Sequence, residues 1–443
     1  MEIIWDIIVV GGGPAGMMAA CRAAERADQE KRPVKILILE KNETLGKKLL
    51  ITGGGRCNVT NAEFDNRTLL EKFKGSDKFL FSAFAQYSVR ETLDFFHSRN
   101  MPTKIENEKR VFPKSDSAQS VWNVLVESLG KSGVNVRSKA EVIDLVTEEK
   151  GLLESVRLKT GEIIHGKNFI LATGGKSHPE TGSTGQGFAW LSKLGHTVSE
   201  PKAALVPVET SDPWIKKLSG FSLPQAKITL FQNGQKVPGK QAVKKGKVLF
   251  THFGLSGPAV LNMSAEIGEL LKYGELTLSL DLLPTHDYAT LNEALQKLFA
   301  KQSNKKFKNA LDELIPSPLI QVIIEQSKIS PDIFCHSVTR EERLSLVKIL
   351  KDLPIHPTGL LGADKAIITS GGVALKEVDF RAMRSRLIPN LYLIGDILDI
   401  DRPSGGYSLQ LCWTTGWVAG NAVISPSPKS HQSGSGLQIP ERD

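Results

Sequence analysis

Three glycines near the N-terminus have the spacing of a turn that binds a dinucleotide. Gly11 permits a tight turn after an apolar strand, and Gly13 lacks a Cβ that would keep the backbone away from a pyrophosphate. Gly16 lets the following helix pack closely on the strand. Pro14 and Ala15 begin that helix, whose N-terminal N–H groups favour a phosphate. The segment therefore predicts a dinucleotide pocket.

Glu40 follows a second apolar run, which the sequence predicts as a strand over 34–39. It stands about twenty residues beyond the turn, where a carboxylate binds the ribose of a dinucleotide. The alternative is an ordinary strand–turn–helix unit with a solvated glutamate. Because strand, turn, helix and acid occur in order, the sequence favours the dinucleotide, but this segment does not decide between FAD and NAD.

Gly395 and Asp396 end a predicted strand over 391–394, close to the C-terminal end of the fold. Glycine at this position avoids a clash between a Cβ and a cofactor chain, and Asp396 can accept hydrogen bonds from ribityl hydroxyls. NAD has no ribityl group, so the pairing of this segment with the N-terminal turn predicts FAD. A plain turn at the end of a strand is the alternative.

A second glycine-rich segment precedes the last predicted helix, over 408–423. Its residues Gly406, Tyr407, Ser408 and Leu409 place a helix N-terminus where its N–H groups can face the pyrimidine oxygen of a flavin. The alternative is an ordinary helix cap with Ser408 near the N-cap. Thr173 and Gly174 end another strand and are further candidate cofactor contacts, although a tight turn explains them equally well.

A loop rich in glycine and polar residues follows the second strand. Lys47, Lys48 or Arg56 can neutralise the charge of a pyrophosphate, and Gly53 and Gly54 can let backbone N–H groups approach the isoalloxazine. A flexible surface loop is the alternative. The other candidate cofactor contacts around this loop are Lys41, Thr52, Cys57 and Asn58.

Two residues are candidates for chemistry on a substrate. Cys57 can act as a nucleophile, and His252, between a predicted strand and helix, can donate a proton. No histidine or second cysteine lies close to Cys57 in the sequence, so a small residue beside the cofactor is the simpler interpretation. A hydrogen-bonded structural histidine is the simpler interpretation of His252. The catalytic acid or base is therefore left unassigned.

Composition narrows the class of protein. The chain has 443 residues, enough for two or three domains, and a formal net charge of +8. The lysine clusters at 244–247 and 305–308 are interpreted as solvated faces. Four widely spaced cysteines predict neither a metal site nor disulfides, and they favour a reducing, cytoplasmic location. No apolar run is long enough for a membrane span.

The pattern of apolar residues predicts an α/β protein in which one Rossmann-like domain is divided by two insertions. The expected divisions are the first part of the FAD-binding domain at 1–200, a β-barrel-like subdomain at 201–285, a helical subdomain at 286–355, the second part of the FAD-binding domain at 356–425 and a disordered tail at 426–443. An inserted domain can form the second wall of a substrate site at the carboxyl ends of the strands.

Several blocks resemble the BaiN-like flavoproteins, also called the YhiN-like or aminoacetone oxidase family, of the two-dinucleotide-binding-domain superfamily. They include the N-terminal glycine turn, Ile51-Thr-Gly-Gly-Gly-Arg-Cys-Asn58, Phe250-Thr-His-Phe-Gly-Leu-Ser-Gly-Pro258 and Gly405-Gly-Tyr-Ser-Leu-Gln410, within a resemblance spanning about 5–425. The resemblance implies a GR2-type FAD-binding domain with FAD contacts at Ala15, Glu40, Lys48, Asn58, Val142, Asp396 and around Ser408-Leu409.

The chain differs from the family pattern at two of these positions. Gly395-Asp396 and Tyr407-Ser408 stand where the family pattern is Gly-Glu and Tyr-Asn. Aspartate is one methylene shorter than glutamate but can still bind a ribityl group, whereas the change at Ser408 weakens the inference of a side-chain contact there.

The predicted activity is hydride exchange between the flavin N5 and a small organic substrate, either an activated C=C bond or an amine. No second nucleotide-binding turn is visible, so NAD(P)H is expected only as a transient reductant. The alternatives are a flavoenzyme that modifies tRNA, which predicts salt-dependent RNA binding, and a non-catalytic FAD-binding redox sensor. The sequence does not specify the substrate or the oligomeric state.

Overall fold

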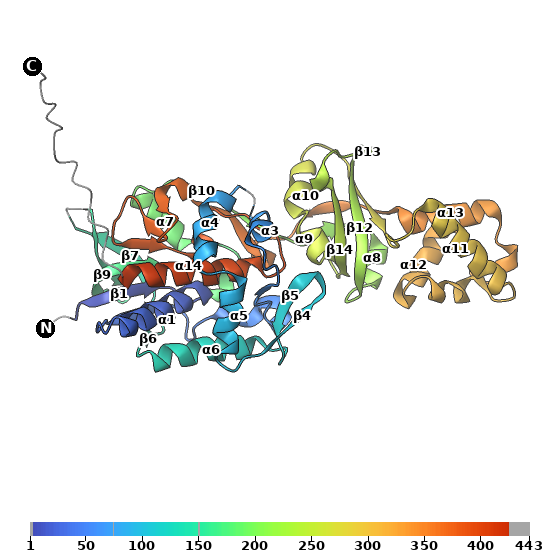
Figure 1. Cartoon of the computed structure of the whole chain (residues 1–443). Coiled ribbons are helices and arrows are strands. Elements are labelled where there is room, and N and C mark those ends of the chain that lie inside the picture. Colours follow the sequence, from blue (N-terminus) through green and yellow to red (C-terminus); the bar gives the residue numbers. More distant parts are fainter. Residues whose placement is uncertain (1–2, 74, 149–150, 425–443) are drawn as a thin grey trace, which may run out of the picture.

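The computed structural model describes residues 3–73, 75–148 and 151–424, which form three lobes in a row (Figure 1). We call them the Rossmann-like lobe (3–204 and 366–424), the β lobe (205–283 and 353–361) and the helical lobe (287–351). The β lobe lies in the middle, between the other two. The tail expected at 426–443 lies outside the described residues.

The Rossmann-like lobe is built on a parallel sheet. β1 (Trp5–Val10) pairs with β2 (Ile36–Leu39) on one side and β9 (Ile163–Leu171) on the other, β2 pairs with β6 (Asn135–Arg137), and β9 pairs with β22 (Leu391–Leu393). The apolar runs of β1 and β2 are buried because helices and loops cover both faces of the sheet. The carboxyl ends of these strands meet at one edge, where such folds bind ligands.

Two helices cross the sheet in direct contact with each other. α1 (Pro14–Gln29) packs along α14 (Tyr407–Ile424), and Gly416 and Gly420 of α14 face the α1 backbone so closely that a Cβ at either position would clash. Both helices begin at the carboxyl ends of the strands, so two positive helix ends point toward the same edge of the sheet.

The region 79–100, whose apolar residues favour helix, contains two helices. α4 (Asp77–Gln86) ends before Tyr87, and α5 (Val89–His97) starts with a capping box between Ser88 and Glu91.

The remaining elements of the lobe are α2 (Lys47–Ile51), β3 (Thr60–Asn61), α3 (Asn66–Leu70), β4 (Thr103–Glu106), β5 (Arg110–Pro113), α6 (Ala118–Lys131), β7 (Val142–Thr147), β8 (Leu153–Leu158), α7 (Gln186–Lys193), β20 (Val378–Asp379) and β21 (Arg384–Ser385).

Two antiparallel strands connect this lobe to the β lobe. β10 (Val198–Ala204) leads out and β19 (Ile368–Val373) leads back beside it. The buried apolar cluster that the described residues form at the junction is small and consists of Leu205, Leu261 and Ile368. We call this junction the neck.

The β lobe is an antiparallel sheet with the order β17-β16-β12-β14-β15-β11-β18. Its strands are β11 (Val208–Thr210), β12 (Ser222–Gln232), β13 (Gln235–Lys236), β14 (Val243–Phe250), β15 (Gly254–Ser256), β16 (Leu276–Asp281), β17 (Leu353–Ile355) and β18 (Pro357–Leu360), with short helices α8 (Pro213–Lys217), α9 (Pro258–Leu261) and α10 (Ser264–Leu270).

The helical lobe contains α11 (Tyr288–Lys301), α12 (Ser317–Ser327) and α13 (Arg340–Lys351). The chain leaves the β lobe after β16 and returns to it at β17, so the helical lobe is an insertion within the β lobe. The boundary expected at 355/356 is therefore wrong, because β17 and β18 pair into the β-lobe sheet.

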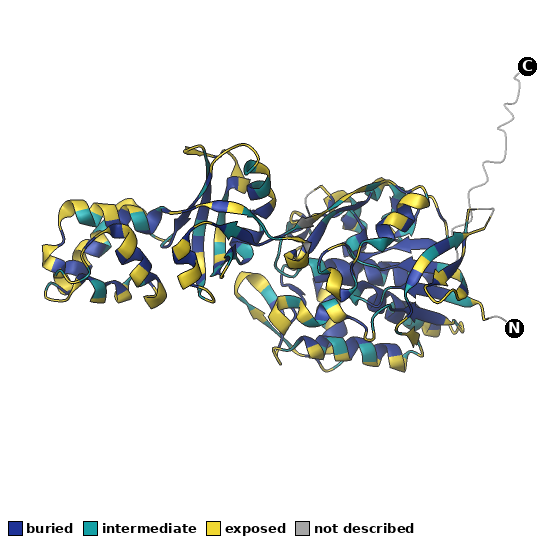
Figure 2. Cartoon of the chain, turned by 180° about the vertical axis from the view of Figure 1, so that it is seen from behind, coloured by how far each residue is buried: buried dark blue, intermediate teal, exposed yellow. Residues whose placement is uncertain are grey.

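The described part of the chain forms two large hydrophobic cores. One fills the Rossmann-like lobe, and the other runs through the β lobe and the helical lobe together. Figure 2 shows buried residues along the inner faces of the sheets and exposed residues on the outer faces of the helices. The two inserted lobes thus form one packing unit, which we call the insertion.

Candidate cofactor-binding site

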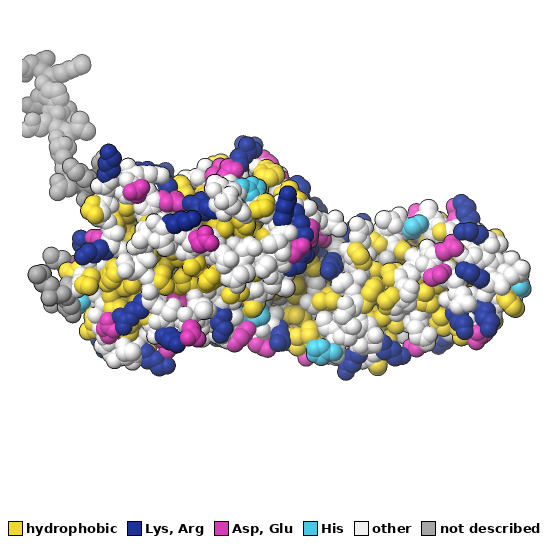
Figure 3. Space-filling model, turned by 90° about the horizontal axis from the view of Figure 1, so that it is seen from below, with side chains coloured by type: hydrophobic (Ala, Val, Ile, Leu, Met, Phe, Trp, Pro, Cys, Tyr) yellow, Lys and Arg dark blue, Asp and Glu magenta, His cyan; other side chains and the backbone are white. Residues whose placement is uncertain are grey.

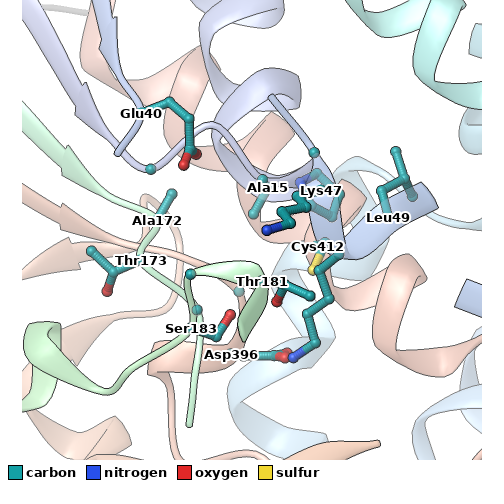
Figure 4. A pocket seen from close by; sticks show the side chains of 18 of the residues that line it. Ala15, Glu40, Lys47, Leu49, Ala172, Thr173, Thr181, Ser183, Asp396 and Cys412 are labelled. Carbon is teal, nitrogen blue, oxygen red and sulfur yellow. The ribbon is translucent and has the colours of Figure 1, made fainter. Parts of the chain in front are cut away.

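A cavity lies at the carboxyl ends of β1, β2, β9 and β22 (Figure 4). It brings together sequence-predicted residues from segments far apart in the chain. Those that line it are Gly11, Gly13, Pro14, Ala15, Glu40, Lys41, Lys47, Lys48, Thr52, Val142, Thr173, Gly174, Gly395, Asp396, Ser408 and Leu409. In Figure 4, Glu40 and Asp396 lie on opposite sides of the cavity.

Glu40 is fixed at the end of β2 by three hydrogen bonds. Its Oε2 accepts from the Gly12 N–H at 2.9 Å, and its Oε1 accepts from the backbone N–H and Nδ2 of Asn42 at 2.8 and 2.7 Å. The side chain is buried but lines the cavity. An oriented carboxylate of this kind is suited to accept hydrogen bonds from a pair of sugar hydroxyls.

Gly13 and Thr173 show that the cavity fits a ligand. An added Cβ on Gly13 would meet no atom within 4 Å, so the N-terminus of α1 opens directly into free space. Thr173 Oγ1 is buried and has no hydrogen-bond partner among the described residues. A buried polar atom without a partner carries a desolvation penalty, which a hydrogen bond from a ligand would remove.

Three lysines tie one wall of the cavity to a covering loop, residues 177–186. Lys41 Nζ donates to Thr184 Oγ1 at 3.1 Å, and Lys47 Nζ donates to the Glu180 carbonyl at 3.0 Å. Lys48 Nζ donates to both the carbonyl and the hydroxyl of Ser177, at 3.0 and 2.6 Å. These ammonium groups and the N-termini of α1 and α14 make the cavity suited to an anionic group.

The pKa of Lys48 is lowered by burial, while the nearby Asp396 carboxylate acts in the opposite direction. An anion in the cavity would favour the charged form of this side chain.

Asp396 faces the cavity from the turn after β22, and its carboxylate is paired with Arg402. The Arg402 side chain is fully buried, with its Nε donating to Ser408 Oγ at 3.0 Å and its Nη1 to the Ile400 carbonyl at 2.8 Å. One arginine therefore joins Asp396 to the start of α14. Arg402 was missed in the sequence, although it immediately precedes the recognised glycine-rich loop.

Arg56 does not line the cavity, so its predicted role beside a pyrophosphate is not supported. Its guanidinium pairs with Glu106 and with Asp116, and it lies 4.2 Å above the Phe112 ring. These two carboxylates supply the counter-charge that a pyrophosphate would otherwise provide. Gly53 and Gly54 are exposed beside the cavity, with φ of 58° and 68°, and are also absent from its lining.

Neither candidate for substrate chemistry reaches the cavity lining. Cys57 is completely buried, and burial raises the pKa of its thiol to about 12, so the reactive thiolate is disfavoured. His252 is exposed on the turn between β14 and β15, with its ring against Phe253.

Four other predicted contacts have structural roles outside the lining. Gly16 packs against the Gly11 carbonyl, and Gly406 packs against the Thr60 backbone. Asn58 Oδ1 accepts from the Val111 N–H at 3.2 Å, and Tyr407 packs edge-on against a phenylalanine ring.

Several lining residues were not predicted as contacts. Most belong to the covering loop and its surroundings: Asn42, Leu49, Thr181, Gly182, Ser183, Thr184, Gly185, Gln186, Trp190 and Cys412. Gly182 and Gly185 have φ of 107° and 83°, and their spacing was the available signal for a close backbone approach. The Cys412 thiol is buried, which raises its pKa to about 12.

Within residues 3–73, 75–148 and 151–424, no three or more His, Cys, Asp or Glu side chains are grouped as metal ligands. None of the helices in these ranges has the length and apolar character needed to cross a membrane.

Two solved structures share the fold. The 3-ketosteroid-delta4-(5alpha)-dehydrogenase from Rhodococcus jostii RHA1 aligns with a TM-score of 0.51 at 15% identity, covering 96% of this chain and 98% of that one. The 3-ketosteroid delta1-dehydrogenase from Sterolibacterium denitrificans aligns with a TM-score of 0.52 at 13% identity, covering 95% and 99%. Identities this low show the fold alone.

The family model described as the HI0933-like protein Rossmann domain matches residues 5–422. The 3-dehydro-bile acid delta(4,6)-reductase of Clostridium scindens is 31% identical over 417 residues, 94% of this chain and 98% of the reductase. The ribosomal RNA dihydrouridine synthase of Escherichia coli is 29% identical over 427 residues, 95% and 98% of the two chains. The predicted resemblance to BaiN-like proteins is confirmed. The chain therefore belongs to the HI0933-like Rossmann-domain family of flavin-dependent oxidoreductases.

Proposed function

We propose that this chain is an FAD-dependent reductase of a C=C bond conjugated to a carbonyl group. The observation that carries the proposal is the single cavity that joins Glu40, the open N-terminus of α1 at Gly13, and Asp396. These three features suit a ribose, a pyrophosphate and a polyhydroxyl chain, which occur in this order in FAD.

Each group of residues has a separate task in binding. Glu40 accepts hydrogen bonds from the adenosine ribose, while the α1 N-terminus, Lys47 and Lys48 hold the pyrophosphate. Asp396, held by Arg402, accepts from ribityl hydroxyls. When bound, FAD supplies two-electron hydride exchange at its flavin ring. The protein orients the cofactor and limits the access of water through the loop 177–186.

The N-terminus of α14 contributes to the reactive end of the site. Ser408 and Leu409 line the cavity there, so the positive end of the helix would stabilise negative charge on the ring of a flavin bound in the cavity. The buried thiols of Cys57 and Cys412 stay protonated.

The two relatives that match over nearly their full length support reduction of a conjugated C=C bond. One is named for reduction of a 3-dehydro-bile acid and the other for synthesis of dihydrouridine in ribosomal RNA. Both names describe addition of hydrogen to a C=C bond conjugated to a carbonyl. In the balanced reaction, a hydride reaches the carbon β to the carbonyl and a proton reaches the α carbon. NAD(P)H is the proposed source of the two electrons.

The purified protein tests the proposal directly. We expect visible flavin absorbance, or its recovery after reconstitution with FAD, and bleaching of that absorbance on anaerobic mixing with NADH or NADPH. An α,β-unsaturated ketone should then restore the oxidised spectrum with loss of its conjugated absorbance. Absence of FAD uptake would contradict the cofactor assignment. Bleaching of the oxidised enzyme by an amine, without response to unsaturated ketones, would support the alternative of amine oxidation.

A further inference from the structure

The helical lobe lies at the opposite end of the molecule from the cofactor cavity, with the β lobe between them (Figure 1). A small substrate in the cavity cannot reach residues 287–351. A binding surface on this lobe would therefore serve a ligand long enough to extend along the molecule.

Two exposed rings on this lobe form a flat platform. Phe334 and His336 stack with their ring centroids 5.5 Å apart and their planes 7° apart, and the Phe334 side chain is among the exposed large hydrophobic groups. The His336 ring is held in place because its Nδ1–H donates to the Ser303 carbonyl at 2.7 Å. The platform is thus rigid and open to solvent.

Three lysines border the platform because the backbone pairs their segment with it. Lys306 and Phe334 form an antiparallel bridge, and the Cys335 N–H donates to the Lys305 carbonyl at 2.9 Å. We call the set Lys305, Lys306, Lys308, Phe334 and His336 the lysine–aromatic patch.

The patch keeps an excess of positive charge. Nζ of both Lys306 and Lys308 lies 3.0 Å from the same Asp332 oxygen, so two ammonium groups share one carboxylate. Lys305 is exposed and adds a third ammonium group. In Figure 3, lysine and arginine side chains gather toward the outer end of this lobe, together with histidine and hydrophobic side chains.

We propose that the lysine–aromatic patch binds single-stranded RNA. The lysines contact phosphates, and the Phe334–His336 pair stacks an unpaired base. An acidic protein surface would also match the lysines, but exposed parallel rings beside them favour RNA, whose unpaired bases present flat faces for stacking. This inference does not rest on the proposed function.

The first test measures binding of fluorescein-labelled single-stranded RNA to the FAD-loaded protein as a function of salt. We expect affinity to fall steeply with salt. Lys305→Ala/Lys306→Ala/Lys308→Ala should weaken binding at least tenfold and reduce the slope of log K against log salt by about 2, since each contact with a single-strand phosphate contributes about 0.7.

A matched variant removes three exposed lysines from the Rossmann-like lobe instead: Lys72→Ala/Lys78→Ala/Lys131→Ala. It changes the net charge equally and should leave affinity and slope near those of the wild type. Equal losses of RNA affinity in the two triple variants would overturn the proposal that the patch binds RNA. The absence of RNA binding by the wild type at low salt would overturn it as well.

The aromatic platform is tested separately. Phe334→Ala should weaken RNA binding roughly tenfold without changing the salt slope, because a stacked base is lost and no phosphate contact is. Phe334→Tyr keeps a ring and should retain the affinity. If Phe334→Ala binds RNA like the wild type, or if heparin binds as the RNA does and depends equally on the lysines, the patch is a general polyanion site and the proposal fails.

Reduction of a small unsaturated ketone provides the independent readout. It should be unchanged in the patch variants, because the patch is remote from the cavity. RNA binding without any C=C reduction would contradict the proposed function alone, whereas reduction of the ketone without RNA binding would contradict this inference alone.

Discussion

The cavity and the helical lobe use lysines in opposite ways. Lys41, Lys47 and Lys48 extend across the cavity wall and donate to a covering loop. Lys305 and Lys306 of the helical lobe lie on an exposed surface beside flat rings. Lys41 and Lys48 are partly buried, whereas Lys47 is exposed like Lys305 and Lys306. Charges held between a cavity and its covering loop suit a ligand that is enclosed, whereas charges on an open surface suit one that remains largely in solvent. The molecule thus separates the place of chemistry from a place of recognition.

The cores are divided in the same way. The Rossmann-like lobe has its own core, and the β and helical lobes share the second. Among the described residues, a small apolar cluster at the neck lies between them, and the Ser404 N–H donates to Asn262 Oδ1 across the same junction. A change inside one unit should therefore disturb that unit first.

The largest expected effect comes from breaking the core of the insertion. Lys351 Nζ lies 2.7 Å from Asp281 Oδ2, both side chains are buried, and Lys351 also donates to the Leu283 carbonyl at 3.0 Å. Lys351→Met leaves the Asp281 carboxylate buried without its partner. It should lower the free energy of unfolding of the insertion by about 3–5 kcal/mol, measured by hydrogen exchange in α13.

The control for this prediction is Asp281→Asn/Lys351→Met, which removes both charges and should recover part of the loss. FAD content should stay unchanged in either variant. Loss of FAD in step with the insertion would show that the two units do not behave independently.

A change in the cavity should weaken FAD binding rather than destabilise the insertion. Gly13 has an ordinary φ of −75° and open space in the direction of a Cβ, so Gly13→Asp should fold normally. Its carboxylate would face the proposed pyrophosphate, and this repulsion should weaken FAD binding about a hundredfold. Isothermal titration of the apoprotein with FAD measures the effect. Gly13→Ala, which adds no charge, should lose less, and equal affinities for FAD in the two variants would argue against an anion at this position.

A smaller loss is expected at Lys48. Lys48→Met keeps a long apolar side chain but removes the ammonium group between the cavity and Ser177. The FAD affinity should fall roughly tenfold, since a hydrogen bond to a charged group is lost, and hydrogen exchange in residues 177–186 should accelerate. Lys139→Met, at an exposed lysine paired with Glu43 outside the cavity lining, is the matched control and should change neither measurement.

Much of the cavity could be predicted because each segment that lines it carries its own local sequence signal. Gly13, Glu40 and Asp396 each follow directly after an apolar strand, and parallel strands bring their carboxyl ends to one edge. Their positions therefore follow from turn chemistry and strand order. The covering loop was recognisable only as glycine-rich, because its contacts with the lysines depend on tertiary packing.

The failures concern partners that are distant in sequence. Arg56 was placed at the cofactor because its acidic partners, Glu106 and Asp116, could not be located before the fold was known. The exposure of Lys305 and Lys306 agrees with the solvated face expected there, but the backbone bridge that brings Phe334 beside them could not be located in the sequence. β17 and β18 could not be assigned to the β lobe from the sequence, because the helical lobe separates them from the strands with which they pair.

The smallest expected effect is a pH dependence on the Rossmann-like side of the neck. The His196 ring is buried between Glu377 and Ser385, with its Nδ1 3.1 Å from Glu377 Oε2 and its Nε2 2.9 Å from Ser385 Oγ. Burial lowers its pKa below the ordinary value of 6.5. The unfolded chain therefore binds a proton first as the pH falls below 6.5, so the folded state is weakened there and keeps its full stability above it.

Urea unfolding between about pH 7.5 and about pH 5.5, monitored by hydrogen exchange in β21, should show this loss of stability in the wild type. His196→Gln should flatten the dependence, although it lowers the stability at the higher pH by removing a buried hydrogen-bonded ring. Hydrogen exchange of backbone amides in the insertion measures the stability of the second core. Its pH dependence should not change with His196→Gln. An equal change in both units would mean that the neck transmits the protonation of His196 and that the separation drawn between the two cores is too sharp.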